Sequence, residues 1–178
     1  MDYTHHCVTP LGPITLAADG IGLIGLWFDG QKHFAETLGQ EHVSASLPVF
    51  GEAERWLEVY FSGSAPDCTP RLSMRASPFR RAVWEILLTV PYGQTVTYGQ
   101  IAERMGLSSR SARAVGAAVG HNAISLIIPC HRVLGADGSL TGYAGGVFRK
   151  RMLLQLEGVR LRGSAALETG PEKTRSGP

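Results

Sequence analysis

The stretch that most constrains the fold is residues 97–120, where two short helical patterns are separated by a glycine-containing turn. Thr97 and Gln100 form a T-x-x-Q capping box that opens the first helix, and Gly106 is suited to end it. The second helical pattern reads RSARAVGAAVG. Two short helices joined by a tight turn are typical of a helix-turn-helix, so the sequence predicts that motif here.

The second of these helices is nearly free of bulky side chains, with Arg113 as the exception in its middle. Small residues allow a helix to approach another backbone closely, and that backbone can belong to a neighbouring helix or to DNA. The pattern alone leaves both partners open. The small residues in question are Ala112, Ala114, Gly116, Ala117, Ala118 and Gly120.

The first half of the chain carries strand patterns and one helical pattern. Two β-prone runs within residues 13–28 flank Asp19-Gly20, a dipeptide suited to a hairpin turn. An apolar stripe then predicts a helix that Gly63 ends, and the turn-rich residues 64–77 are typical of a linker. The stripe consists of Phe50, Ala53, Leu57, Tyr60 and Phe61.

Two further helical patterns complete the second half. One begins at Ser77-Pro78, an N-cap residue followed by a proline in the first turn. The other, VFRKRMLLQLEG, closes the patterned part of the chain. From its apolar spacing, this last helix is expected to bury Phe148, Met152, Leu153 and Leu156 and to point Arg149, Lys150 and Arg151 outward.

These patterns predict a scaffold domain with its linker at residues 1–76, a mainly helical domain at residues 77–160 and a disordered tail at residues 161–178. The charges are distributed unevenly. Residues 1–79 carry 4 Lys/Arg and 9 Asp/Glu, whereas residues 80–159 carry 9 and 4. A basic half favours a polyanionic partner such as nucleic acid, although a solvated basic face accounts for it equally well.

The composition also bears on the compartment. No apolar stretch approaches the roughly 20 residues that span a bilayer, and the first segment lacks the features of a signal peptide. The cysteines are odd in number and far apart, at Cys7, Cys68 and Cys130, which suits a reducing compartment. We therefore expect a cytoplasmic protein that has no disulfide framework and does not bind membranes.

Cys130 and His131 follow the apolar run LIIP, which is typical of a buried strand. A thiolate is the reactive form of cysteine, and a nearby imidazole promotes its formation. Adjacent side chains of a strand point to opposite faces, so His131 can serve Cys130 only if the chain bends or water bridges them. Pro129 favours a bend, and Glu157 is a candidate to orient the imidazole. A buried structural cysteine remains an equally good interpretation.

Four motifs together carry a resemblance to a known family. Over about residues 8–159 the chain resembles the O6-alkylguanine-DNA alkyltransferases, on the motifs RAVGAAVGHN (113–122), PCHRV (129–133), GSLTGYAGG (138–146) and LLQLEG (153–158). The resemblance implies an α+β fold with a small amino-terminal antiparallel sheet and a helix, similar to ribonuclease H. A mainly helical, winged-helix-like domain with the helix-turn-helix follows, and it would bind DNA and accept the alkyl group.

The resemblance implies direct DNA repair in a single turnover. The alkyl group of O6-alkylguanine would pass irreversibly to the protein after the damaged base is flipped out of the duplex. Activity on O4-alkylthymine is left open by the sequence. The partner would be double-stranded DNA, bound through the minor groove by a protein that is monomeric in solution and able to assemble cooperatively on DNA. No cofactor is implied.

The resemblance also assigns residue roles. Cys130 would accept the alkyl group, and a network of Glu157, His131, water and the thiol would generate the thiolate. Arg113 would replace the extruded base, and Tyr98 would crowd the 3′ phosphate and donate to the guanine ring. The remaining DNA- and base-binding positions are Ser111, Ala112, Gly116, Asn122, Val133, Tyr143, Ala144 and Gly145.

Within that set the implied roles differ. Asn122 would tie the helix-turn-helix to the cysteine loop, while the carbonyls of Cys130 and Val133 and the amide of Ala144 would read the base. Tyr143 and Gly145 would wall the pocket.

The chain departs from the family pattern at Ala123, where proline is usual, and at Ser125, where proline or alanine is frequent. These departures leave the preference for alkyl size open. His5, His6 and Cys7 do not have the spacing of a standard zinc motif, so we expect a flexible amino terminus and no metal site.

Two other functions fit parts of the sequence. A hydrolase with a Cys-His-Glu site would form a thioester, but it leaves the helix-turn-helix and Arg113 without a purpose. A protein that binds DNA lesions without chemistry would explain the helix-turn-helix, but family members of that kind lack the reactive cysteine.

Overall fold

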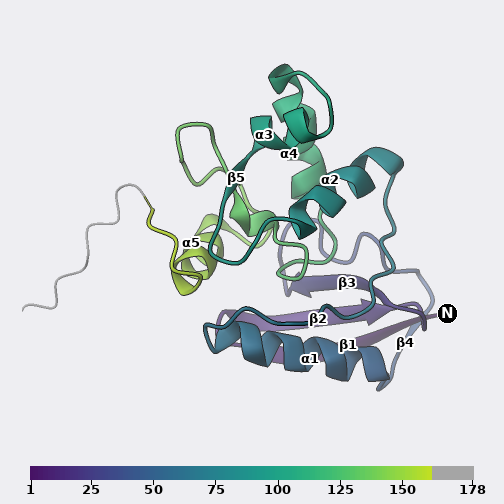
Figure 1. Cartoon of the computed structure of the whole chain (residues 1–178). Helices are drawn as coiled ribbons and strands as arrows, with labels where there is room; N and C mark the ends of the chain where they lie inside the picture. Colours follow the sequence, from purple (N-terminus) through teal and green to yellow (C-terminus); the bar gives the residue numbers. More distant parts are fainter. Residues whose placement is uncertain (162–178) are drawn as a thin grey trace, which may run out of the picture.

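The computed structural model describes residues 1–161 (Figure 1). Apart from Leu161, the tail expected to be disordered at residues 161–178 lies outside the described residues. Within the described range the chain forms a four-stranded sheet, a two-stranded sheet and five α-helices, and is therefore an α+β protein.

The four-stranded sheet is built from the first half of the chain. Its strands are β1 (Asp2–Thr9), β2 (Gly12–Ala18), β3 (Leu23–Phe28) and β4 (His42–Ser44), arranged in the order β3-β2-β1-β4. The β1–β2 and β2–β3 pairs are antiparallel, as expected, whereas β4 adds to β1 in parallel.

The predicted hairpin is confirmed, and Gly20 adopts a φ of 83°, which favours glycine. The expectation of a flexible amino terminus is wrong. Strand β1 pairs with β2 continuously from Tyr3, opposite Ala18, to Thr9. The sequence of this strand lacks a regular apolar alternation and so gave no strand signal. Its ladder of backbone hydrogen bonds with β2 holds it in the sheet.

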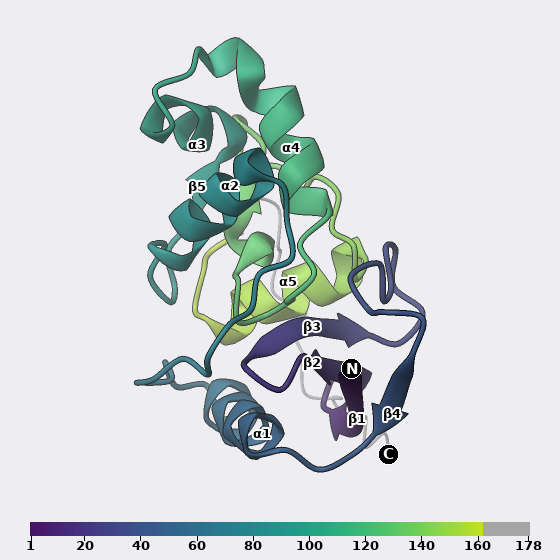
Figure 2. The same cartoon turned by 90° about the vertical axis from the view of Figure 1, so that its right-hand side faces the viewer.

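Helix α1 (Pro48–Phe61) packs along the sheet, and in both views β3 is the strand nearest to the second half of the chain (Figures 1 and 2). The predicted helix is confirmed, with Gly63 just beyond its end at a φ of 85°. Its buried side chains are Phe50, Ala53, Trp56, Leu57 and Tyr60.

The turn-rich segment at residues 64–77 is attached to the sheet along part of its length. The Leu23 amide donates to the Arg71 carbonyl at 2.8 Å, and the Ser73 amide donates to the Leu23 carbonyl at 2.7 Å. Arg75 donates to both carboxylate oxygens of Asp2, at 2.6 and 2.8 Å. The linker is therefore anchored to β3 and to the start of β1.

The second half is mainly helical and lies beyond β3 (Figure 2). Its elements are α2 (Pro78–Leu88), β5 (Val96–Thr97), α3 (Tyr98–Arg104), α4 (Ala112–Gly120), β6 (Val133–Leu134) and α5 (Val147–Leu156). Strands β5 and β6 form a short parallel pair.

The predicted helix starts are confirmed. The Ser77 side chain accepts from the Arg80 amide, and the full capping box of Thr97 and Gln100 is present. Helices α3 and α4 pack against each other in the helix-turn-helix arrangement. Among the described residues, no helix combines the length and apolar character that a membrane span requires.

Candidate active site

The run that leads to Cys130 is buried, but it is not the strand that the sequence predicts. Within residues 1–161 its one β-bridge joins Ile124 to Leu26 of β3, where the Leu26 amide donates to the Ala123 carbonyl at 2.8 Å. Leu126 then turns the chain with a φ of 70°. An apolar run indicates burial whether the backbone is extended or turning, which explains the error.

Asn122 holds this turning segment together. Its side-chain oxygen accepts from the Ile124 amide at 3.0 Å, and its nitrogen donates to the Ile128 carbonyl at 2.8 Å and to Cys130 Sγ at 3.0 Å. These bonds offset the strain of the left-handed backbone at Leu126. Asn122 therefore connects the end of α4 to the cysteine, as the resemblance implies.

Cys130–Arg132 form a 3-10 helix, so the expected departure from strand geometry at Pro129 is present. The Cys130 side chain is buried, with 4% of the residue exposed. This burial raises the pKa of the Cys130 thiol, although Asn122 and Lys150 act in the opposite direction. The resting thiol is therefore protonated at neutral pH, and a base is required to ionise it.

His131 is the adjacent base. Its Nε2 lies 2.7 Å from Glu157 Oε1, and both side chains are fully buried. A carboxylate only accepts, so Nε2 carries the proton and Nδ1 keeps its lone pair. Among the described residues no protein atom bonds to Nδ1. Burial lowers the pKa of His131, although Glu157 opposes this effect. A neutral imidazole results, which is able to accept a proton.

Glu157 is the hub of the buried network. It accepts from Arg132 Nε at 2.9 Å, from the Tyr60 hydroxyl at 2.8 Å and from the Gly93 amide at 3.0 Å. Burial alone would raise the pKa of Glu157, but its bonds to His131 and Arg132 lower it to about 2. The carboxylate therefore stays ionised and keeps the imidazole in one tautomer.

Tyr60 and Arg132 are site residues that the sequence reasoning did not identify. Arg132 stands inside the PCHRV motif, so its position beside Cys130 and His131 was an available signal. Tyr60 lies on α1, 97 residues from Glu157 in the sequence, and its helical pattern indicates only that it is buried. Nothing local distinguishes it from a core tyrosine.

The expected orientation of α5 is wrong at Phe148, Met152 and Lys150, whereas Leu153 is fully buried and Leu156 packs against the core, as expected. Phe148 is 72% exposed and Met152 is 38% exposed, whereas Lys150 is fully buried. The Lys150 ammonium donates to the Val133 carbonyl at 2.5 Å and to the Thr141 carbonyl at 2.9 Å. These two carbonyls replace water around the charge and make burial of the lysine tolerable. Burial also lowers the pKa of Lys150 to about 8.

Replacing Lys150 with methionine keeps the length of the side chain but leaves both carbonyls without this donor. We expect the free energy of unfolding to fall by about 1 to 3 kcal/mol, measured by urea denaturation. Arg151→Met, at an exposed neighbour, is the control and should change it by less than about 0.5 kcal/mol. Equal stability of the two variants would contradict the role of the buried ammonium.

A pocket with a volume of about 390 Å³ opens between α3, α4 and the loop after β6. It is within the size range of small-molecule sites. Four of the predicted residues line it, namely Tyr98, Gly116, Tyr143 and Ala144. Gly145 does not line it but lies behind Tyr143, where a Cβ would stand 2.7 Å from the tyrosine ring. Cys130 is not among the lining residues.

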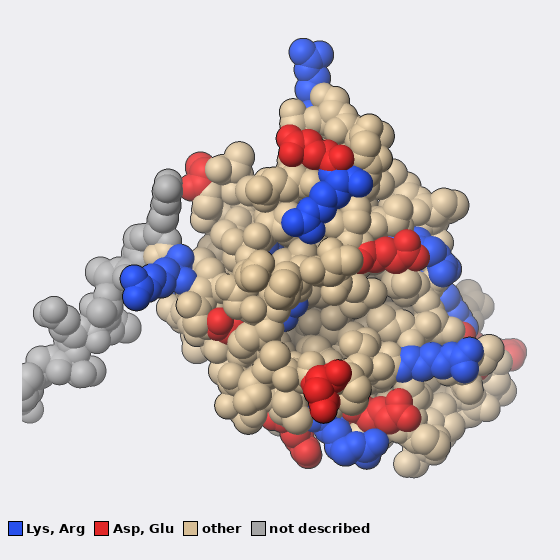
Figure 3. Space-filling model, viewed as in Figure 1, with Lys and Arg blue, Asp and Glu red and all other residues tan. Residues whose placement is uncertain are grey.

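The other predicted positions are not among the residues that line this pocket. Arg113 is exposed on α4, and Ser111 and Ala112 are half-buried at the start of the same helix. The Val133 carbonyl already accepts from Lys150, so one lone pair remains for another donor. On the face of the molecule in Figure 3, positive and negative side chains are intermingled and form no patch of one sign.

Comparison with known proteins gives a consistent family. The profile of the 6-O-methylguanine DNA methyltransferase ribonuclease-like domain matches residues 3–73, and that of the corresponding DNA binding domain matches residues 78–159. A Mycobacterium tuberculosis methylated-DNA–protein-cysteine methyltransferase is 44% identical over 149 residues, which cover 84% of this chain and 88% of the relative. One from Methanosarcina acetivorans is 43% identical over 150 residues, covering 84% and 94%.

The fold comparison agrees with the sequence comparison. The crystal structure of Mycobacterium tuberculosis OGT in complex with DNA matches this chain with a TM-score of 0.78 at 43% sequence identity. The match covers 87% of this chain and 92% of that one.

Proposed function

The chain belongs to the 6-O-methylguanine DNA methyltransferase family, and from this premise we propose that Cys130 is the cysteine that accepts the alkyl group. The protein transfers the methyl group of O6-methylguanine in DNA to one of its own cysteines and so repairs the base. The main support for this proposal is the setting of Cys130. Its Sγ accepts from the Asn122 side chain at 3.0 Å, and the next residue in the chain is His131, which pairs with Glu157.

The first step is removal of the thiol proton. His131 Nδ1 is the acceptor, and we infer that a water molecule carries the proton from Cys130 to it. Glu157 holds Nε2–H and stabilises the imidazolium that forms. The thiolate is thus generated only during the reaction, which agrees with the raised pKa of the resting thiol.

The second step is displacement at the alkyl carbon. A sulfur lone pair forms the S–C bond as the C–O6 bond breaks, and the bonding electrons pass to guanine. Guanine takes up one proton and the His131 imidazolium releases one, so the protons balance. The product is a thioether, which has no carbonyl for water to attack. Each protein molecule therefore reacts once, because nothing in the site regenerates the thiol.

Access to the sulfur requires the base to leave the duplex. A base that remains stacked does not reach a cysteine that is 4% exposed, so we propose that the damaged base is flipped into the pocket. Helix α4 would lie in the minor groove, with Ser111, Ala112 and Gly116 close to the backbone and Arg113 filling the gap in the duplex.

Inside the pocket, Tyr98 is well placed to donate to the guanine ring, since its hydroxyl already accepts from Thr141 at 3.0 Å. The amide of Ala144 and the carbonyls of Cys130 and Val133 would read the edge of the base. Tyr143 would form the wall, with Gly145 behind it. Each of these contacts is a proposal for the complex with DNA.

The test is an intact-mass measurement after incubation with a duplex that contains O6-methylguanine. We expect a gain of about 14 Da on the Cys130 peptide, limited to one equivalent per chain because the thioether is permanent. Turnover of an ester substrate without modification would instead indicate the hydrolase. Binding of the damaged duplex without a mass change would indicate a lesion-binding protein.

Arg113→Ala is expected to slow transfer from duplex DNA by about 10-fold or more, because flipping loses the side chain that replaces the base. Transfer from a single-stranded oligonucleotide should change much less, since no base pair has to open. Arg55→Ala removes the same charge from α1 and is the control. Equal rates for Arg113→Ala and the wild type on duplex DNA, in single-turnover assays, would refute this role.

The remaining proposals concern the setting of the reaction. We propose that the protein acts in the compartment that holds the DNA, which is the cytoplasm in a bacterium, as a monomer that is able to assemble cooperatively on DNA. Binding to DNA should weaken as salt increases and depend little on sequence, because contacts to phosphates dominate.

A further inference from the structure

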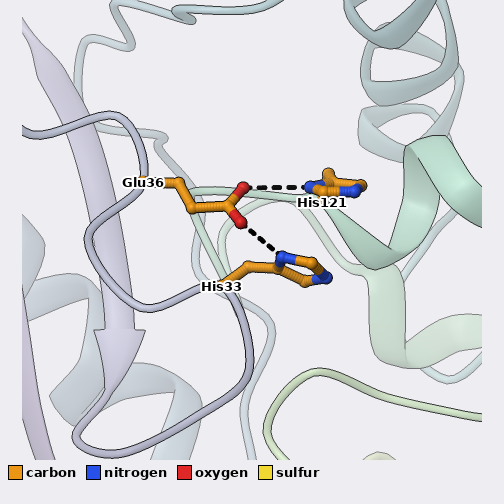
Figure 4. Close-up of side chains that lie close together, drawn as sticks. All are labelled: His33, Glu36 and His121. Carbon is orange, nitrogen blue, oxygen red and sulfur yellow. Dashed lines mark hydrogen bonds and ion pairs between the residues drawn. The ribbon is translucent and has the colours of Figure 1, made fainter.

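Three side chains that alkyl transfer does not use meet beside the pocket (Figure 4). His33 and Glu36 come from the loop that follows β3, and His121 comes from the end of α4. One nitrogen or oxygen from each lies within 4.8 Å of the others. The cluster therefore joins the first half of the chain to the helix-turn-helix.

Both imidazoles direct the same atom at one carboxylate. His33 Nδ1 lies 2.5 Å from Glu36 Oε1, and His121 Nδ1 lies 3.0 Å from Glu36 Oε2. The two rings lie close together, with a centroid separation of 3.9 Å, and are tilted by 38° to each other.

Two neutral imidazoles and a carboxylate are a donor set that suits borderline divalent metals. Zn²⁺ binds imidazole nitrogen and carboxylate oxygen together, whereas Ca²⁺ and Mg²⁺ prefer oxygen alone. The side chains of His33, Glu36 and His121 are 27%, 45% and 26% exposed, so an ion has a path from solvent and water is able to complete its coordination.

The backbone of the loop supports a constrained site. His33 has a φ of 60° and Ala35 has a φ of 57°, a left-handed conformation that non-glycine residues seldom adopt. Two such residues within three positions turn His33 and Glu36 toward the same point. Strain of this kind persists where other contacts hold it, and it is concentrated at functional sites.

We propose that His33, Glu36 and His121 bind a divalent transition metal ion, with Zn²⁺ as the expected occupant, through the two Nδ1 atoms and the carboxylate. This assignment replaces the expectation of no metal site. The competing interpretation is that Glu36 simply accepts a hydrogen bond from each imidazole, with no ion between them.

The proposed metal site lies at the rim of the pocket. His33 and His121 both line the pocket, and His121 directly precedes Asn122, which holds Cys130. A bound ion would clamp the loop after β3 onto the end of α4 and fix one rim of the pocket. Binding of Zn²⁺ should therefore stabilise the folded chain.

The test uses the full chain without a polyhistidine tag, stripped with a chelator and titrated with Zn²⁺ by calorimetry. We expect one equivalent of Zn²⁺ per chain. His33→Ala and His121→Ala should each weaken binding by at least about 10-fold, because each removes one of three protein ligands. His42→Ala is the matched control, since this exposed histidine lies on β4 away from the cluster.

Glu36→Gln separates the two interpretations. The amide keeps an oxygen that accepts from one imidazole but lacks the charge that a metal requires. Loss of Zn²⁺ binding with an unchanged melting temperature of the metal-free protein supports the proposal. Zn²⁺ binding that is absent in the wild type, or unaffected in the His33 and His121 variants, overturns it. Cys68→Ala, which removes an exposed thiol, should bind Zn²⁺ as the wild type does.

A thermal measurement gives a second readout. At a free Zn²⁺ concentration about 100 times the Kd, the wild-type Tm should rise by at least about 5 °C, because the ion binds the folded chain selectively. The rise should vanish in His121→Ala and persist in His42→Ala. An equal rise in both variants would place the ion elsewhere. Neither measurement involves alkyl transfer, so the outcome is independent of the function proposed for Cys130.

Discussion

Replacing Cys130 with alanine is expected to abolish alkyl transfer from O6-methylguanine in DNA and to leave binding of the duplex within about twofold. The sulfur is the atom that forms the new bond, so no neighbouring group substitutes for it. The side chain is buried and is not part of α4, so binding should survive. Intact mass and a binding titration on the same duplex measure the two effects.

The chain offers a matched control in its other two cysteines. Burial raises the pKa of Cys7 to about 11, and a hydrogen bond with Asp67 raises the pKa of Cys68, so neither is a good nucleophile. The double variant Cys7→Ala with Cys68→Ala should accept one alkyl group, as the wild type does. A mass gain that persists in Cys130→Ala would assign the acceptor to another residue.

Replacing Glu157 with glutamine is expected to have the largest effect on stability, a loss of about 3 to 5 kcal/mol in the free energy of unfolding. The carboxylate is the partner of buried Arg132 and also accepts from Tyr60 and His131. Glutamine has a similar shape, but it leaves the guanidinium charge uncompensated and brings an amide N–H toward other donors. Urea denaturation measures the loss.

The same variant should transfer the alkyl group about 100-fold more slowly, because the imidazole loses the carboxylate that orients it. The rate is to be measured in single turnovers at a temperature where the variant is folded, which circular dichroism verifies. Glu58→Gln, at an exposed position of α1, is the control and should be neutral in both assays. A variant as stable as the wild type would show that Glu157 is not the hub of the network.

The dependence on pH follows from the lowered pKa of Glu157. The group has a pKa of about 2 in the folded chain against an ordinary value of 4.5, so it stabilises the fold fully above the ordinary value. That contribution is lost as pH falls from about 4.5 toward 2. The stability difference between the wild type and Glu157→Gln should therefore shrink in this window.

Features that depend on neighbours three or four residues apart were predictable from the sequence. Ser77 and Thr97 start α2 and α3 as expected, because capping bonds are made within one helical turn. The hairpin around Asp19-Gly20 is equally local. In contrast, β1 was not predicted. Its residues do not alternate regularly between apolar and polar, and pairing with β2 and β4 holds the strand in the sheet.

Burial and orientation depended on contacts between distant segments. An apolar run predicts a strand before Cys130. In the structure these side chains are buried from a turning segment, which the hydrogen bonds of Asn122 to Ile124 and Ile128 hold together. Lys150 of α5 is buried because its ammonium donates to two carbonyls, that of Val133 in β6 and that of Thr141 in the loop after β6. The hydrophilic character of lysine predicts that Lys150 is exposed.

The helix-turn-helix and the adjacent Cys130 and His131 were predictable from the residue order alone, because capping boxes, turns and a contiguous motif each involve residues that are close in the chain. That Tyr60 bonds to Glu157, and that Glu36 bonds to His121, became visible only in the folded chain. Those pairs are separated by 97 and 85 residues, and no periodicity extends that far. Their meeting depends on how β3 and α1 pack against the second half, which is a property of the whole core.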